Sequence, residues 1–130
     1  MAVAVDNVAL IQEGYQRFAR HDVPGVFALF SPELVWTIPG PAELAGVYRG
    51  HEGVGGFLAK LQESWEEQQV RPLELFGEGD RVVVLGEHLI VRKGEAYRVP
   101  FAHAWTVEGG LATSFYEYTD TAEIERILAG

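Results

Sequence analysis

The chain has 130 residues, of which 48% are hydrophobic, and carries a formal net charge of −9. This length suits one domain that buries roughly two-thirds of its unfolded surface, so residues 1–130 are expected to form a single domain. Because cysteine is absent, disulfides, thiolate metal sites and cysteine nucleophiles are excluded, and a reducing cytoplasm is favoured.

Charge and hydropathy exclude two classes of partner. The acidic balance repels phosphate backbones, and the basic residues are scattered without a stripe, so no nucleic-acid partner is expected. No apolar run approaches the ~20 residues that span a bilayer, and the first residues lack a basic region followed by an apolar core. We therefore expect a cytoplasmic protein with no membrane partner, whose function is pocket chemistry or partner binding.

Helical patterns dominate the first half of the chain. Apolar residues recur at intervals of three and four, which predicts helices with one buried face over residues 6–20, 24–30 and 51–65. Between them, the β-branched and aromatic residues 34–38 predict a strand. A loop rich in proline and glycine follows over residues 39–50.

The second half is typical of strands joined by short turns. Four strands are predicted, over residues 69–79, 81–92, 96–108 and 111–119. They form an antiparallel meander. Asp120 has the spacing of a helix cap with Glu123 three positions later, so a last helix is expected from there to Leu128.

This order of elements indicates the α+β class, with helices packed on one face of a curved sheet. The central strands are apolar at nearly every position, whereas an antiparallel strand with one solvated face should alternate. The second, convex sheet face is therefore expected to be covered by another copy of the protein in a twofold homodimer.

Four stretches in this order resemble the nuclear transport factor 2-like superfamily, in its SnoaL-like and ketosteroid-isomerase-like branch. They are HDVPGVFALFSPELVWTIPG, AGVYRG, VPFAHAWTVEGG and FYEYTDTA. The resemblance spans essentially the whole chain and implies a cone-shaped, cystatin-like roll that encloses an apolar pocket, usually in a homodimer. It implies no single reaction, because the superfamily includes isomerases, cyclases, epoxide hydrolases and proteins that only bind.

Steroid isomerisation is disfavoured by the residues at the family's functional positions. The resemblance places the general-base aspartate at Ile38, the second pocket acid at Ala102 and the oxyanion-hole tyrosine at Gly14, one residue from Tyr15. All three positions are altered.

Limonene epoxide hydrolases are similar at one point. Their catalytic acid falls at Glu117 in FYEYTD, while their arginine and second aspartate fall at His88 and Ile90. One acid is kept, the arginine is replaced by histidine, and the other acid is lost, so the same three-residue activation of water is not available.

Strand alternation predicts which side chains share the pocket. Glu117 and His88 are the candidate catalytic pair, placed across the short side chain of Ala102. A one-residue slip of the GEHLI strand would instead bring Glu87 into the pocket. The expected pocket residues are Tyr15, Trp36, Ile38, Ile90, Ala102 and Phe115.

A Glu117 carboxyl ringed by apolar groups should have a raised pKa, which suits proton abstraction or activation of a water. Such chemistry requires a cavity of at least a few hundred Å3. The competing interpretation is a buried hydrogen bond that only satisfies two polar groups. Tyr15 could likewise bring its hydroxyl to the pocket or serve as a core residue, and Trp36 is expected as a pocket wall, with core packing as the alternative.

The remaining histidines have the sequence patterns of neither a pocket pair nor a metal site. His103 alternates with Ala102, so it is expected on the convex face, in the dimer interface. The pairs His21-Asp22 and His51-Glu52 lack ligand spacing, and no metal is expected.

The sequence therefore predicts a small, largely apolar ligand and no cofactor. The favoured activity is that of an isomerase, cyclase or hydrolase using Glu117. The alternatives are a non-catalytic module that binds a ligand or a partner, and a subunit whose pocket is closed by its own side chains.

Overall fold

The computed structural model describes residues 6–40 and 43–130, so residues 1–5 and residues 41–42 of the predicted loop lie outside the described part. The helices are α1 (Asn7–Ala19), α2 (Val23–Phe27), α3 (Gly50–Ser64) and α4 (Thr121–Ala129). The strands are β1 (Phe30–Ile38), β2 (Gly46–Arg49), β3 (Glu67–Glu78), β4 (Arg81–Arg92), β5 (Glu95–Glu108) and β6 (Leu111–Thr119). No helix among the described residues is both long and apolar enough to cross a membrane.

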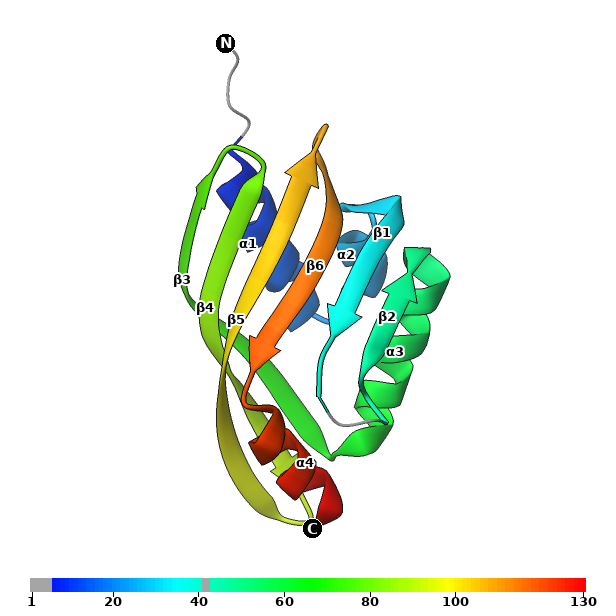
Figure 1. Cartoon of the computed structure of the whole chain (residues 1–130), viewed down its shortest axis with the longest axis vertical. Coiled ribbons are helices and arrows are strands. Elements are labelled where there is room, and N and C mark those ends of the chain that lie inside the picture. The colour runs from blue at the N-terminus through cyan, green and yellow to red at the C-terminus, as the bar shows by residue number, and fades with distance from the viewer. Residues whose placement is uncertain (1–5, 41–42) are drawn as a thin grey trace.

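The six strands form one sheet in the order β2-β1-β6-β5-β4-β3, with α1 and α2 packed behind it in Figure 1. All neighbouring strands are antiparallel except β1 and β6, which are parallel. The α+β class and the meander of the last four strands are thus confirmed. The β1–β6 pairing connects the strand between the helices to the last strand of this meander, so that β6 lies inside the complete sheet.

Two local predictions in the first half were wrong. The predicted second helix ends at Phe27, and the chain is already in β1 at Phe30, which pairs with Ala112 of β6. This long-range pairing overrides the local helical pattern. Strand β2 lies within the predicted loop, because four residues paired only with β1 leave too short a pattern to detect.

Aspartates begin three of the helices. Asp6, Asp22 and Asp120 each accept a hydrogen bond from the backbone N–H three residues later. The predicted cap at Asp120 is confirmed, with Oδ1 3.0 Å from the Glu123 nitrogen. Glu123 does not complete the capping box, because its carboxylate pairs with Arg126 instead.

Strand β5 faces the opposite way from the prediction. Phe101, His103 and Trp105 are buried on the inner face, while Ala102 lies on the outer face. Burying three large rings removes more apolar surface from water than burying small alanines. The placement of Ala102 in the pocket and of His103 in a convex interface is therefore wrong, since one residue of register inverts a whole strand.

Gly86 allows an aromatic side chain to pack across β4 and β5. It pairs with Phe101, whose ring stacks on His103 at a centroid distance of 3.7 Å. A Cβ at Gly86 would lie 2.6 Å from Phe101 Cζ and would clash with the backbone oxygen of Arg71. The missing side chain thus helps to position His103.

We expect Gly86→Ala to lower the free energy of unfolding by about 2 kcal/mol or more, because neither the backbone nor the stacked ring can move freely. Chemical denaturation measures this. The control is Gly56→Ala on the exposed side of α3, where a Cβ meets nothing within 4 Å; it should raise stability by about 0.5–1 kcal/mol. An unchanged stability of Gly86→Ala would contradict the packing constraint.

Candidate functional site

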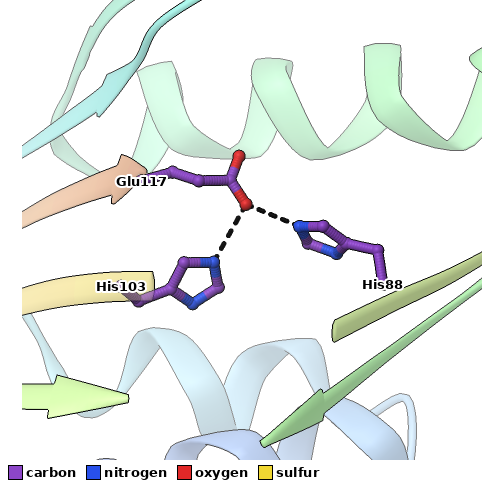
Figure 2. A group of neighbouring side chains, drawn as sticks. All are labelled: His88, His103 and Glu117. Carbon is purple, nitrogen blue, oxygen red and sulfur yellow. Dashed lines mark hydrogen bonds and ion pairs between the residues drawn. The ribbon is translucent and has the colours of Figure 1, made fainter. Parts of the chain in front are cut away.

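Three polar side chains from adjacent strands meet on the buried inner face of the sheet (Figure 2). They are His88 of β4, His103 of β5 and Glu117 of β6. His103 and Glu117 are register partners. A single carboxylate oxygen, Glu117 Oε2, lies 2.6 Å from His88 Nε2 and 3.0 Å from His103 Nε2.

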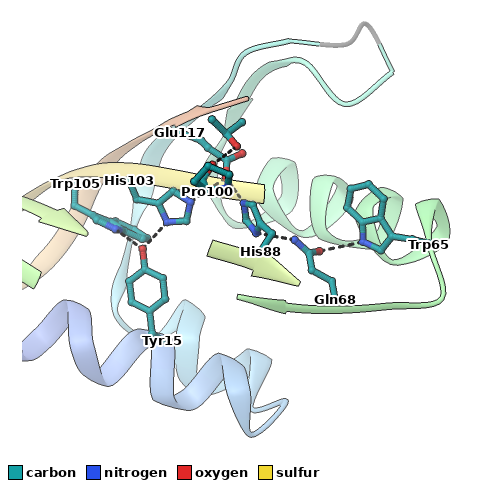
Figure 3. Close-up of polar contacts among 9 residues, drawn as sticks. Tyr15, Trp65, Gln68, His88, Pro100, His103, Trp105 and Glu117 are labelled. Carbon is teal, nitrogen blue, oxygen red and sulfur yellow. Dashed lines mark hydrogen bonds and ion pairs between the residues drawn. The ribbon is translucent and has the colours of Figure 1, made fainter. Parts of the chain in front are cut away.

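A chain of hydrogen bonds supports His88 from the end of α3. The Trp65 indole N–H donates to Gln68 Oε1 at 3.2 Å, and Gln68 Nε2 lies 3.0 Å from His88 Nδ1 (Figure 3). An indole nitrogen can only donate. Trp65 therefore fixes the orientation of the Gln68 amide, which directs an N–H at His88.

A second chain supports His103 from α1. The Trp105 indole donates to the Tyr15 hydroxyl at 3.1 Å, and that hydroxyl lies 2.6 Å from His103 Nδ1. The Tyr15 ring also stacks in parallel with the His103 ring. The Tyr15 hydroxyl thus lies beside the cluster, while its ring belongs to the hydrophobic core (Figure 3).

These two chains set the protonation pattern of the cluster. The Gln68 amide donates to Nδ1 of His88, so the His88 proton resides on Nε2 and is donated to Glu117. At His103, Nε2 faces the carboxylate and carries the proton, and burial disfavours a second proton on Nδ1, which therefore accepts from the Tyr15 hydroxyl. Both histidines are therefore neutral donors, and Glu117 is an acceptor. The second carboxylate oxygen, Oε1, accepts no hydrogen bond from the described residues.

The cluster lies at one side of a cavity of about 110 Å3 between the sheet and the helices. Four of the predicted pocket residues line it, namely Tyr15, Trp36, Ile38 and Phe115, together with Glu117 and His88. Ile90 is buried on the His88 face of β4 but does not line this cavity. Glu87 points to the outer face, beside Arg71 and Arg98.

Comparison with known proteins identifies the family. A family model described as the SnoaL-like domain matches residues 11–115. The chain belongs to the SnoaL-like family. This confirms the resemblance drawn from the sequence.

Solved structures share the whole SnoaL-like fold. A crystal structure of an NTF2-like protein of unknown function from Burkholderia pseudomallei is 33% identical, with a TM-score of 0.91, and covers 98% of this chain and 100% of its own. TerC, co-crystallized with polyporic acid, is 28% identical with a TM-score of 0.89, covering 95% of this chain and 98% of its own. The uncharacterized protein Rv0034 of Mycobacterium tuberculosis is 28% identical, over 95% of this chain and 96% of its own.

Glu117 is held ionised in this SnoaL-like cavity. Burial raises the pKa of its carboxyl, but the hydrogen bonds from His103 and His88 oppose burial, and the net pKa lies well below the ordinary value. The sequence led us to expect a raised pKa. That expectation was wrong because it counted the apolar surroundings and no N–H donor from His103.

The groups beside Glu117 stay in their neutral forms. Burial lowers the pKa of His103, although the hydrogen bond and the charge of Glu117 oppose this effect. Burial raises the pKa of Tyr15 well above its ordinary value; the Trp105 hydrogen bond opposes the rise and the charge of Glu117 adds to it. These directions agree with the proton positions derived from the hydrogen bonds.

The three side chains of the cluster are also the residue types of a two-histidine, one-carboxylate metal site, with ligand atoms within 4.8 Å of one another. A metal would need the lone pairs of both Nε2 atoms. At His88 that requires Gln68 to turn its amide, which would place its NH2 group against the Trp65 N–H. The donor set therefore fits a metal poorly.

The sequence did not point to four members of this site, namely His103, Gln68, Trp65 and Trp105. His103 and Trp105 were missed through the inverted register of β5. The pairing of β5 with β6 would have indicated the correct register. His103 pairs with Glu117 and Trp105 pairs with Phe115, and directly paired residues point to the same face of a sheet. Gln68 and Trp65 carry no motif, and only the turn from α3 into β3 places them beside His88.

We expect the protein to lose stability on acidification. The lowered pKa of His103 means that the unfolded chain binds more protons below the ordinary histidine value of 6.5, and the lowered pKa of Glu117 adds the same effect below 4.5. Stability is thus greatest at neutral pH and falls with pH in two stages. Glu117→Gln should remove the lower stage, on the order of 2 kcal/mol, in thermal unfolding followed against pH.

The control for this experiment is Glu125→Gln, which removes an exposed carboxylate on α4. It should leave the acid profile of the wild type unchanged. If Glu117→Gln and the wild type lose stability in parallel below pH 4.5, the carboxylate is not held ionised by the histidines.

Proposed function

We propose that the protein binds a small, largely apolar molecule that donates one hydrogen bond to Glu117. The observation that carries this proposal is the unpartnered Oε1 of an ionised carboxylate beside an apolar, aromatic-lined cavity. Oε1 is not sealed off by neighbouring atoms, so a ligand in the cavity can reach it and gain a hydrogen bond to a charged group.

The size of the cavity limits the ligand. Its volume of about 110 Å3 is smaller than the few hundred Å3 expected of a catalytic pocket. Engineered cavities of about 150 Å3 hold benzene, so the cavity as it stands suits a single small ring or a branched chain. The co-crystallisation of its relative TerC with polyporic acid supports small-molecule binding by this fold.

Binding is favoured over catalysis by the electrostatics of Glu117. A carboxylate whose pKa lies well below the ordinary range is a weak base and drives proton abstraction poorly. Acid–base chemistry is the second candidate function, because Tyr15, His103 and Glu117 form an unbroken hydrogen-bonded path along which a proton could move. In that case a bound molecule would emerge chemically altered.

The test compares two molecules of the same shape, cyclopentanol and methylcyclopentane. Only the alcohol donates a hydrogen bond, so it should bind about tenfold more tightly in an NMR titration, as expected for a hydrogen bond to a charged group. Gly14 lines the cavity on α1, and a Cβ there has its nearest contact at 3.6 Å, from Leu29. Gly14→Leu should fill the cavity and abolish binding of both probes.

Equal affinities for the two molecules would contradict the role of Glu117, and binding that survives in Gly14→Leu would place the ligand elsewhere. Recovery of the bound alcohol unchanged is expected. Enzyme-dependent conversion of a bound probe would instead support the second candidate function.

We also propose that the outer face of the sheet pairs with a second copy of the chain. Phe76, Leu85, Tyr116 and Tyr118 are exposed on this face, with 57% of the Tyr118 surface accessible. Glu87 on the same face is neutralised by Arg71 and Arg98. The chain as a whole is acidic, but the one carboxylate described here on this apolar face is paired with arginines. Two copies of the face can therefore approach each other without strong repulsion.

Light scattering after size exclusion should therefore report a dimer. Tyr118→Arg introduces a positive charge on each copy at the contact. Repulsion between the two charges and their desolvation should shift the population toward monomer. Because the side chain is exposed, the variant should keep the far-UV circular dichroism spectrum of the folded wild type. A wild-type monomer at micromolar concentration would refute the pairing.

A further inference from the structure

The cavity offers a ligand one full charge, and that charge is negative. Glu117 is the only acidic residue among the described residues that line it, and no lysine or arginine is among them. The two histidines are neutral, and their Nε2–H groups already donate to Glu117. An anionic ligand would therefore meet a buried carboxylate and no counter-charge.

We infer that the ligand is a small organic cation, an ammonium group carrying apolar substituents, whose N–H donates to Glu117 Oε1. This inference names the ligand class of the binding site proposed above and rests on that proposal. It goes further, since a neutral alcohol would satisfy the proposed function but not this inference.

The walls next to Glu117 suit a positive charge. Trp36 and Phe115 stack at a centroid distance of 3.8 Å, and Trp105 meets both rings edge-on, at 5.8 and 4.7 Å. All three line the cavity. Aromatic faces attract cations through their quadrupoles, most strongly where water is excluded.

The cost of burying charge falls mainly on the ligand. Ion pairs are often unfavourable inside proteins because both partners must lose their water. Here Glu117 is already buried and ionised in the free protein, so only the ligand has to be desolvated. Alkyl substituents dilute the charge of an ammonium group and weaken its hydration, so a substituted amine is preferred over ammonium itself.

The hydrogen bonds keep this anionic site from neutralising itself. A protonated histidine would offset the charge of Glu117, but a proton on His88 Nδ1 would face the N–H of Gln68, whose amide Trp65 holds in place. His103 is disfavoured as a cation by burial. Neither histidine therefore offsets the negative charge that Glu117 presents to the ligand.

The experiment measures the affinities of cyclopentylamine, cyclopentanol and cyclopentanecarboxylate at pH 7.5 by NMR titration. The ring is the same in all three, and the charge is positive, zero and negative. The amine should bind at least about tenfold more tightly than the alcohol, because both donate to the carboxylate but only the amine adds the attraction of opposite charges at low dielectric and cation–π attraction to the rings. The carboxylate should not bind.

Two variants separate the site from general attraction to an acidic protein. Glu117→Gln keeps the shape and removes the charge, so the preference for the amine over the alcohol should disappear. Glu125→Gln removes an exposed acid and should leave it unchanged. Amine binding should also change little with added salt, because a buried pair is weakly screened.

An alcohol that binds as tightly as the amine would overturn the inference while the proposed function stands. Failure of all probes to bind would overturn both. Zn²⁺ that binds at the cluster and displaces the amine would show a metal site in place of an organic-cation site, and would also refute the inference.

Discussion

The site depends on one carboxylate oxygen that accepts two N–H hydrogen bonds. Glu117 Oε2 receives them from His88 and His103, which neighbouring strands present from the same face of the sheet. Without these donors, a carboxyl buried among aromatic rings would take up a proton at neutral pH. With them it remains charged, and its free oxygen gives the apolar cavity a negative charge, while no lysine or arginine is among the described residues that line it.

Two chains of hydrogen bonds lead to the histidines and support the positions of their ring protons. Trp65 and Trp105 each begin a chain of donors, one through Gln68 and one through Tyr15, and both chains end at Glu117. Because an indole cannot accept, Trp65 fixes the direction of the first chain. In the second chain the direction follows from His103, which donates from Nε2 to the Glu117 carboxylate and so accepts from Tyr15 at Nδ1. The fold joins them: α1 supplies Tyr15, the end of α3 supplies Trp65, and the four adjacent strands β3 to β6 supply the rest.

Much of this could be predicted from the sequence, and the failures have physical causes. The α+β order, the final meander and the cap at Asp120 follow from local patterns, and the pocket positions of Tyr15, Trp36 and Glu117 follow from periodicity and family resemblance. The facing of β5 does not, because FAHAWTV can bury either set of alternate residues. Pairing with β6 decides which set is buried. As a result His103, expected in an interface, is instead a hydrogen-bond donor to Glu117. The pKa of the carboxyl then moves in the opposite direction from the one expected.

The central claim is that two neutral histidines hold an ionised Glu117, and the most direct measurement is the ¹⁵N chemical shift of their ring nitrogens. At pH 7 both His88 and His103 should show a protonated Nε2 and an unprotonated Nδ1. In Gln68→Glu, where a carboxylate replaces the amide donor, His88 should gain a proton on Nδ1 while His103 stays unchanged. A wild-type His88 or His103 with a proton on Nδ1 would contradict the account, because Glu117 would then lack one of its two neutral donors or face a cation.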